Sequence, residues 1–222
     1  MRNLPGAASC HTTKPRSITA DNYHDANGLL LNTLGITDPK ELKDYDLLAG
    51  RMYAPTALAF AEAQPTLGMA TLDGIHGILF SELYAWAGKP RTVPLHKSET
   101  QFADPDRISG WLDRTMPQFE ATVQRSPAEA DFRRILAELW GRLNWLHPYP
   151  EGNGRATQIF LTAVARRHGY DIDWSLISRA AELDAAIASV KQDFVPYRTL
   201  LTSALARHDP ARPATSYYAD RT

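Results

Sequence analysis

Apolar residues recur every three or four positions through most of this chain, which is the spacing of one face of an α-helix. The first stripe predicts a helix that begins after Thr37 and ends before Pro65. Thr37 and Asp38 are suited to cap its N-terminus, and Glu41 forms a capping box with Thr37. The apolar positions of this predicted helix are Leu42, Tyr45, Leu48, Met52 and Leu58.

Later stretches carry the same period and are bounded by residues that break helices. Helices are predicted over residues 72–86, 105–123, 128–146, 155–168, 175–192 and 196–206. Residues 91–103 depart from this pattern, because two short apolar runs flank a polar turn. They predict a small β-hairpin, and Pro94 places its strand at a sheet edge. The predicted fold class is therefore mostly α, a helical bundle with one small β-hairpin.

Length and composition indicate one globular domain, since 44% of the 222 residues are hydrophobic and 22% are charged. We expect this domain at residues 35–206, after a flexible N-terminal segment at 1–34 and before a C-terminal tail at 207–222. Basic residues are dispersed and the net charge is −1, so the sequence lacks the basic footprint of a nucleic-acid binder. A single cysteine, Cys10, excludes a disulfide within the chain.

No apolar run approaches the roughly 18 residues of a membrane span, and the first residues lack the apolar core of a signal peptide. We therefore expect a cytoplasmic protein with neither nucleic-acid nor membrane partners. Export as an effector, by a route that needs no N-terminal signal, stays open.

Candidate chemistry is concentrated in HPYPEGNGRATQ, residues 147–158, between two apolar helices. His147 titrates near neutrality, and Glu151 is suited to a hard cation or to proton transfer. Residues 152–154 form a glycine loop that leads into a helix N-terminus beside Arg155, which together make an anion cradle. A base, a carboxylate for Mg²⁺ and an anion site favour phosphoryl or nucleotidyl transfer. The plainer alternative is a helix–helix connector with His147 as a helix C-cap.

The stretch HPYPEGNGR resembles the signature of Fic domains (filamentation induced by cAMP), whose pattern is HPFx[DE]GNGRxxR. Tyr149 stands where the pattern has Phe, and Gln158 stands where it has its second Arg. A second segment, LFSELYAWAGKPRTV at residues 79–93, resembles the helix-to-flap segment of the same family. The resemblance covers about residues 35–205 and implies the AMP-transferring type, with GNGR present.

Roles for the motif residues are implied by this resemblance. His147 would deprotonate the hydroxyl of a protein target, and Glu151 would hold Mg²⁺ on the phosphates of ATP. Gly152, Asn153 and Gly154 would bind those phosphates through their backbone, and the Asn153 side chain would contact the α-phosphate. Arg155 would neutralise the β-phosphate. The implied activity is protein adenylyltransferase, which moves AMP from Mg-ATP to a Ser, Thr or Tyr hydroxyl and releases pyrophosphate.

Family flaps are β-hairpins that dock the target chain by strand addition. The residues expected to form the target-docking flap are Thr92, Val93, Leu95, His96 and Lys97. Phe102 lies where such flaps often carry an aromatic residue.

Gln158 is the main departure from the family pattern, because the second arginine normally pairs with the γ-phosphate. An amide does not replace a charge-assisted hydrogen bond to phosphate. Two alternatives therefore stay open: a Fic-fold transferase that uses another nucleotide or phosphoryl donor, and a catalytically silent Fic domain that works as a binding module.

Inhibitory helices of the family carry [ST]xxxE[GN], and the nearest match, Thr37 to Glu41, is followed by Leu42. A capping box explains that match better, so an inhibitor is expected only on a separate small antitoxin chain, as in a toxin–antitoxin pair. A homodimer is a further expected assembly. His76 is interpreted as a packing histidine on an amphipathic helix.

Overall fold

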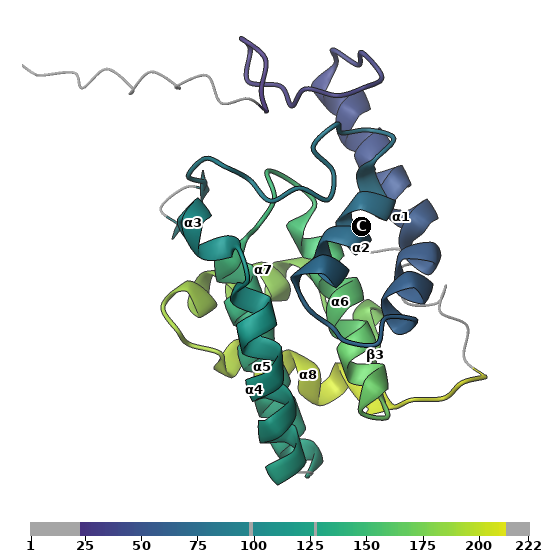
Figure 1. Cartoon of the computed structure of the whole chain (residues 1–222), viewed down its shortest axis with the longest axis vertical. Helices are drawn as coiled ribbons and strands as arrows, with labels where there is room; N and C mark the ends of the chain where they lie inside the picture. Colours follow the sequence, from purple (N-terminus) through teal and green to yellow (C-terminus); the bar gives the residue numbers. More distant parts are fainter. Residues whose placement is uncertain (1–22, 98–99, 127, 212–222) are drawn as a thin grey trace, which may run out of the picture.

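The computed structural model describes residues 23–97, 100–126 and 128–211, and within them the fold is mostly helical, as predicted (Figure 1). The helices are α1 (Pro39–Glu62), α2 (Met69–Phe80), α3 (Pro105–Ile108), α4 (Trp111–Arg125), α5 (Glu129–Leu146), α6 (Asn153–Arg167), α7 (Arg179–Val190) and α8 (Val195–Ala204), with the 3-10 turn η1 (Trp174–Leu176). The strands are β1 (His96–Lys97), β2 (Thr100–Gln101), β3 (Tyr170–Ile172) and β4 (Leu205–Arg207). None of the described helices is long and apolar enough to cross a membrane.

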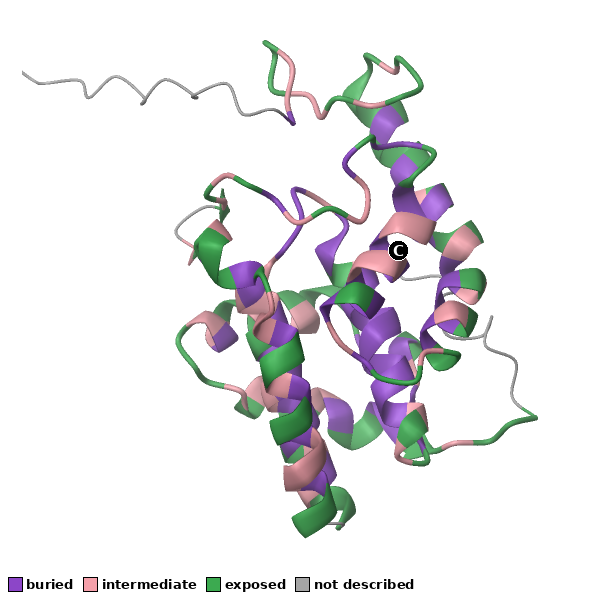
Figure 2. Cartoon of the chain, in the orientation of Figure 1, coloured by how far each residue is buried: buried purple, intermediate pink, exposed green. Residues whose placement is uncertain are grey.

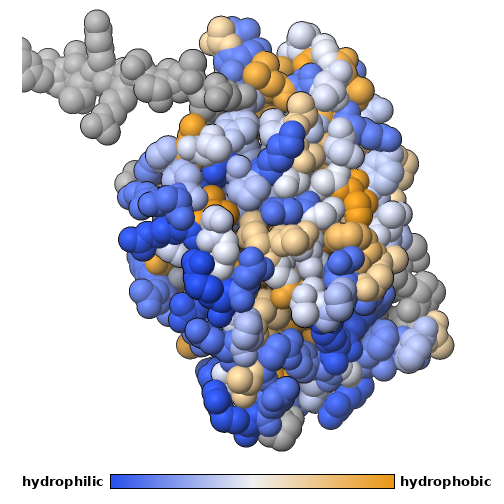
Figure 3. All heavy atoms as spheres, in the orientation of Figure 1, coloured by the Kyte–Doolittle hydropathy of each residue, from blue (hydrophilic) through white to orange (hydrophobic). Residues whose placement is uncertain are grey.

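Helix α6 forms the centre of the bundle (Figures 1 and 2). It packs against α1 and α2 on one side and against α5 on the other. Residues 156–165 are all buried, because this stretch is apolar around most of its circumference. Figure 3 shows hydrophilic side chains over most of one face of the molecule, with apolar ones in small groups. Because α6 packs against α1 and α2, the motif that precedes α6 lies where these three helices meet.

Helix α1 exists as predicted, but of its five predicted apolar positions only Leu42 and Leu58 are buried. Tyr45, Leu48 and Met52 are 42%, 56% and 57% exposed. The buried residues are mostly small: Leu42, Asp46, Ala49, Gly50, Ala54, Ala57, Leu58 and Ala61. Small side chains let α1 approach α2 and α6 closely, which leaves the larger apolar side chains outside. The cap is also different, since Asp38, and not Thr37, accepts the Glu41 N–H at 2.7 Å.

Several predicted helix boundaries were wrong, and a glycine explains one of them. Helix α2 stops at Phe80, and residues 81–88 form turns that still bury Leu83 and Trp86. The helix predicted over residues 105–123 is divided into α3 and α4 at Gly110, whose φ is +65°. The stretch 175–192 begins as η1 and becomes helical only at α7.

Two small antiparallel sheets of two strands each complete the fold, and only the first is a hairpin. The predicted one pairs β1 with β2, with His96 opposite Gln101 and Lys97 opposite Thr100. Residues 98–99, which belong to its predicted turn, lie outside the described residues. The pairing of β3 with β4 was not predicted, because three-residue strands carry too little periodicity to be recognised. Tyr23 is buried and its hydroxyl accepts the Thr92 N–H at 3.1 Å, which fastens the segment before α1 to the base of the hairpin.

Gly88 provides a test of the turn that follows α2. Its φ is +72°, and a Cβ would lie 2.9 Å from the Asp73 carbonyl oxygen and 3.3 Å from the Gly77 Cα. Gly88→Ala should therefore lower the free energy of unfolding by about 2–4 kcal/mol, through backbone strain and overlap. Gly35→Ala is the matched control, because Gly35 has φ +68° with nothing within 4 Å. It should cost only about 1–2 kcal/mol. Equal losses in chemical denaturation would contradict this account.

Candidate active site

The motif begins with a residue in an unusual backbone conformation. His147 ends α5 with φ +43° and ψ +62°, the left-handed region that residues other than glycine seldom adopt. Such strain persists only where the surroundings enforce it. Here Arg91, which is 2% exposed, donates from Nε to the His147 carbonyl oxygen at 2.9 Å, and its backbone N–H donates to the Pro148 carbonyl oxygen at 2.7 Å.

The His147 ring has a defined tautomer. Its Nδ1 lies 3.1 Å from the Asn144 carbonyl oxygen, which can only accept, so Nδ1 carries the proton and Nε2 keeps a lone pair. Phe102 stacks on the ring at 3.9 Å between centroids. Burial, followed by Lys97, lowers the pKa of His147 from 6.5 to about 3. The imidazole is therefore neutral at physiological pH, with Nε2 as the basic atom.

Glu151 is an ionised carboxylate between two cations. Burial raises its pKa, but Lys97, the Gly152 N–H and Arg155 together outweigh burial and hold the pKa below its ordinary value. Lys97 Nζ lies 3.4 Å from Oε2, and the Gly152 N–H donates to Oε1 at 3.0 Å. An ionised Glu151 favours a cation beside its carboxylate.

Helix α6 begins at Asn153, two residues earlier than predicted, so residues 153 and 154 belong to its first turn. The Asn153 side chain closes the preceding loop: Oδ1 accepts the Tyr149 N–H at 2.9 Å, and Nδ2 donates to the Tyr149 carbonyl oxygen at 2.7 Å. The predicted contact between Asn153 and phosphate stays a prediction, and it would use the backbone N–H or the second amide hydrogen.

The two glycines of the motif differ in the space around them. Gly152 has φ +80°, and a Cβ would lie 2.4 Å from Phe80 and 3.1 Å from His76 Nε2, so the packing itself requires glycine. A Cβ on Gly154 would meet nothing within 4 Å. The first turn of α6 therefore presents open backbone at Gly154, as an approaching ligand would require.

Arg155 and Gln158 have acidic partners outside the motif. Arg155 contacts Asp46 of α1 through both terminal nitrogens, and its Cζ lies 4.6 Å from the centroid of the Phe80 ring. Gln158 is buried, and its Nε2 donates to Glu182 Oε1 of α7 at 2.9 Å.

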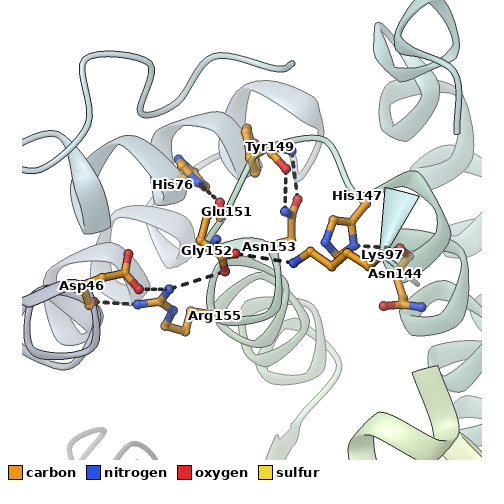
Figure 4. A network of polar contacts seen from close by, with 10 residues as sticks. All are labelled: Asp46, His76, Lys97, Asn144, His147, Tyr149, Glu151, Gly152, Asn153 and Arg155. Atoms are coloured by element: carbon orange, nitrogen blue, oxygen red, sulfur yellow. Dashed lines mark hydrogen bonds and ion pairs between the residues drawn. The ribbon is translucent and has the colours of Figure 1, made fainter. Parts of the chain in front are cut away.

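A cavity of about 610 Å³ lies over the N-terminus of α6. The motif residues that line it are Glu151, Gly152, Gly154, Arg155 and Gln158. Its other walls come from residues 24–30, the first three turns of α1, Tyr84, and the start of α7. Figure 4 shows the polar chain that crosses the site, from Asp46 through Arg155, Glu151 and Lys97 toward His147. Glu151 lines the cavity, whereas His147 is not among its lining residues.

The predicted flap residues lie beside His147, but most of them are outside the strands. Thr92, Val93 and Leu95 precede β1, and only His96 and Lys97 belong to it. The Arg91 side chain anchors this segment by donating to the Val93 carbonyl oxygen at 2.7 Å and to the Ala103 carbonyl oxygen at 2.5 Å. Sequence reasoning did not assign Arg91 a role, because a buried arginine with backbone partners leaves no local pattern.

His76 also has a larger role than the predicted packing. It is fully buried, and its Nδ1 accepts the Gly88 N–H at 3.0 Å, so Nε2 carries the proton and donates to the Glu151 carbonyl oxygen at 2.9 Å. Its ring lies 3.8 Å from that of Tyr149. His76 therefore joins the turn after α2 to the motif loop.

His76 predicts a pH dependence of stability. Burial lowers its pKa from 6.5 to about 4, so between these pH values the unfolded chain binds a proton that the folded chain does not. The free energy of unfolding should fall as pH drops from 6.5 to 4, by at most about 1.4 kcal/mol per pH unit for this group. His76→Gln keeps a donor and an acceptor without titrating, so its stability should decline less steeply in urea titrations. Identical slopes for the two proteins would sink this assignment.

Sequence comparison identifies the class of protein. The model of the Fic/DOC family matches residues 66–165. The chain is 30% identical over 170 residues to a probable protein adenylyltransferase, y4lH, of Sinorhizobium fredii, covering 76% of this chain and 86% of that protein. The chain therefore belongs to the Fic/DOC family. It is also 31% identical over 180 residues to the protein adenylyltransferase VbhT of Bartonella schoenbuchensis, with 76% of this chain matching 36% of that longer protein.

Solved structures agree on the fold. The Fic domain of a VirB-translocated effector of Bartonella quintana, with bound ADP, superposes with a TM-score of 0.70 at 24% identity, covering 84% of this chain and 95% of that one. BepC of Bartonella tribocorum, with bound AMPPNP, gives 0.67 at 22% identity, covering 85% and 98%. The expected Fic fold is thereby confirmed.

Proposed function

We propose that this chain is a protein adenylyltransferase that moves AMP from Mg-ATP to a hydroxyl side chain of another protein. The observation that carries the proposal is the adjacency of two features. His147 presents a basic Nε2, and α6 presents its unpaired N–H groups and the open backbone of Gly154. The adenylyltransferase names of the similar proteins support the same reaction.

The residues fit Mg²⁺ together with nucleotide phosphates. Glu151 is ionised and already has a cation, Lys97, beside it. Within the described residues no three metal-binding side chains cluster, which suits Mg²⁺, an ion commonly held by one or two carboxylates plus substrate phosphates. When bound at Glu151, Mg²⁺ would neutralise charge on the α- and β-phosphates.

Each protein group then has its own role in the proposed reaction. The first turn of α6, at Gly152, Asn153 and Gly154, binds the phosphates through backbone N–H groups and the helix dipole. Arg155 offsets charge on the β-phosphate. His147 Nε2 accepts the proton of the target hydroxyl as that oxygen attacks the α-phosphorus, and pyrophosphate leaves. Phosphate charge close to the ring raises the pKa of His147 from its low ligand-free value, which makes it a better base when ATP is bound.

The hairpin is proposed to dock the target chain. The Phe102 N–H donates to the Leu95 carbonyl oxygen at 3.3 Å, so that pair is hydrogen-bonded within the hairpin. In an antiparallel pair the next residues, His96 and Gln101, direct their backbone groups away from each other. His96 therefore offers an outward N–H and C=O for strand addition, close to His147. Thr92, Val93 and Lys97 would complete this surface.

Gln158 favours a second candidate, a transferase of the same fold with another nucleotide or phosphoryl donor. Its amide donates to the Glu182 carboxylate, so Gln158 itself offers no positive charge to a terminal phosphate. A Fic domain that only binds a partner would lack nucleotide affinity altogether. An antitoxin chain, a homodimer, and a cytoplasmic location or export as an effector are further proposals.

His147→Ala tests the proposed reaction. With Mg²⁺, a cell extract and α-labelled ATP, GTP, UTP or CTP, the wild type should transfer label from ATP to protein bands. The variant should lose at least about 100-fold of this activity, as expected for removal of a general base, while still binding ATP in calorimetry. His208→Ala is the matched control, since His208 contacts Asp171 of β3 away from the motif.

Label from another nucleotide in that assay would favour the second candidate. The absence of both labelling and nucleotide binding in the wild type would leave only a binding module.

His96→Pro tests docking at the hairpin. Proline removes the outward N–H of this edge strand without removing the bond between Leu95 and Phe102. Target labelling should fall roughly tenfold or more, with ATP binding unchanged. His96→Ala keeps the N–H and should label normally. Equal losses in both variants would mean that the target recognises the imidazole and not the backbone, and normal labelling by both would contradict docking at His96.

A further inference from the structure

Arg155 is held by a residue outside the motif, Asp46 of α1, which lies 109 residues earlier in the chain. The Arg155 Nη1 donates to the Asp46 backbone oxygen at 2.6 Å, and Nη2 donates to the carboxylate Oδ2 at 2.5 Å (Figure 4). Asp46 is 7% exposed. Its charged partner in this buried position is Arg155, and the Tyr84 hydroxyl is a second polar neighbour.

The contacts restrain the guanidinium on three sides. Its end, with Nη1 and Nη2, faces Asp46. Its Cδ and Nη1 side faces Gly50, where a Cβ would lie 2.9 Å from Cδ and 3.0 Å from Nη1. One planar face covers the Phe80 ring. Few rotamers are left to Arg155, so its entropy is largely lost before any ligand arrives.

One edge of the guanidinium stays available. Nε–H and the second N–H of Nη2 form the side edge, with which arginine binds an oxyanion through two parallel hydrogen bonds. Within the described residues Nε makes no hydrogen bond. Nη2 lies 4.0 Å from Glu151 Oε1, a distance that places this edge on the motif side of the arginine.

We propose that Asp46 is a positioning residue for the nucleotide, which fixes Arg155 so that this remaining edge faces a phosphate oxygen. The inference rests on the proposed function. The opposite role, in which Asp46 keeps Arg155 away from phosphate, would require the buried pair to separate. That would strand a carboxylate whose Oδ1 already lacks a hydrogen bond in the described part of the chain.

The experiment measures the affinity of the full chain for Mg-ATP by calorimetry. Asp46→Asn keeps the size of the side chain and one acceptor but removes the charge. It should raise the Kd about tenfold, because a charge-assisted hydrogen bond no longer orders the arginine. Arg155→Ala should weaken binding at least as much, and Asp46→Asn should add nothing in the Arg155→Ala background. Asp44→Asn, an exposed acid on α1 paired with Lys40, is the matched control.

Several results would overturn the proposal. Unchanged or tighter binding by Asp46→Asn, or an equal loss in both backgrounds, would overturn the proposal while leaving the proposed function intact. No binding of Mg-ATP by the wild type would overturn both. If Asp46→Asn does not fold, Gly50→Ala displaces Arg155 from the α1 side and should produce the same loss of affinity, and normal affinity in that variant would overturn the proposal.

Discussion

The site depends on how the loop between α5 and α6 is fastened to the rest of the domain. Its first residue, His147, is in the left-handed region, and so is Gly152 at its end, where a Cβ would overlap Phe80. Buried side chains hold it there: Arg91 at its start, Asn153 across it, and His76 at its end. Because these partners bind backbone groups, they fix where the base and the helix N-terminus stand relative to each other.

Charged side chains form a row across the same site. Asp46, Arg155, Glu151 and Lys97 alternate in sign across the site, so that each of these four charges has an opposite neighbour. Such an arrangement keeps a polar site folded in the absence of a ligand, because no buried charge is left unpaired. It also leaves Glu151 ionised and His147 neutral, which are the protonation states that nucleotidyl transfer requires.

The sequence predicted the features that depend on residues close together in the chain. Periodicity identified the helices, and the motif 147–158 located the candidate base, carboxylate and anion site in one continuous stretch. It did not predict what depends on distant contacts. Asp46 was not singled out, and His76 was interpreted as a packing residue, since their partners are far away in the sequence. The prediction for α1 failed at Tyr45, Leu48 and Met52 for the same reason, because the faces packed against α2 and α6 use mainly small residues.

A crystal structure with Mg²⁺ and a non-hydrolysable ATP analogue tests the account most directly. We expect the phosphates over the first turn of α6, the α-phosphorus on the side of His147 Nε2, and Arg155 still bound to Asp46 while its free edge contacts a phosphate oxygen. A triphosphate bound elsewhere, or an α-phosphorus out of reach of His147, would contradict the claim that this loop is a nucleotidyl-transfer site.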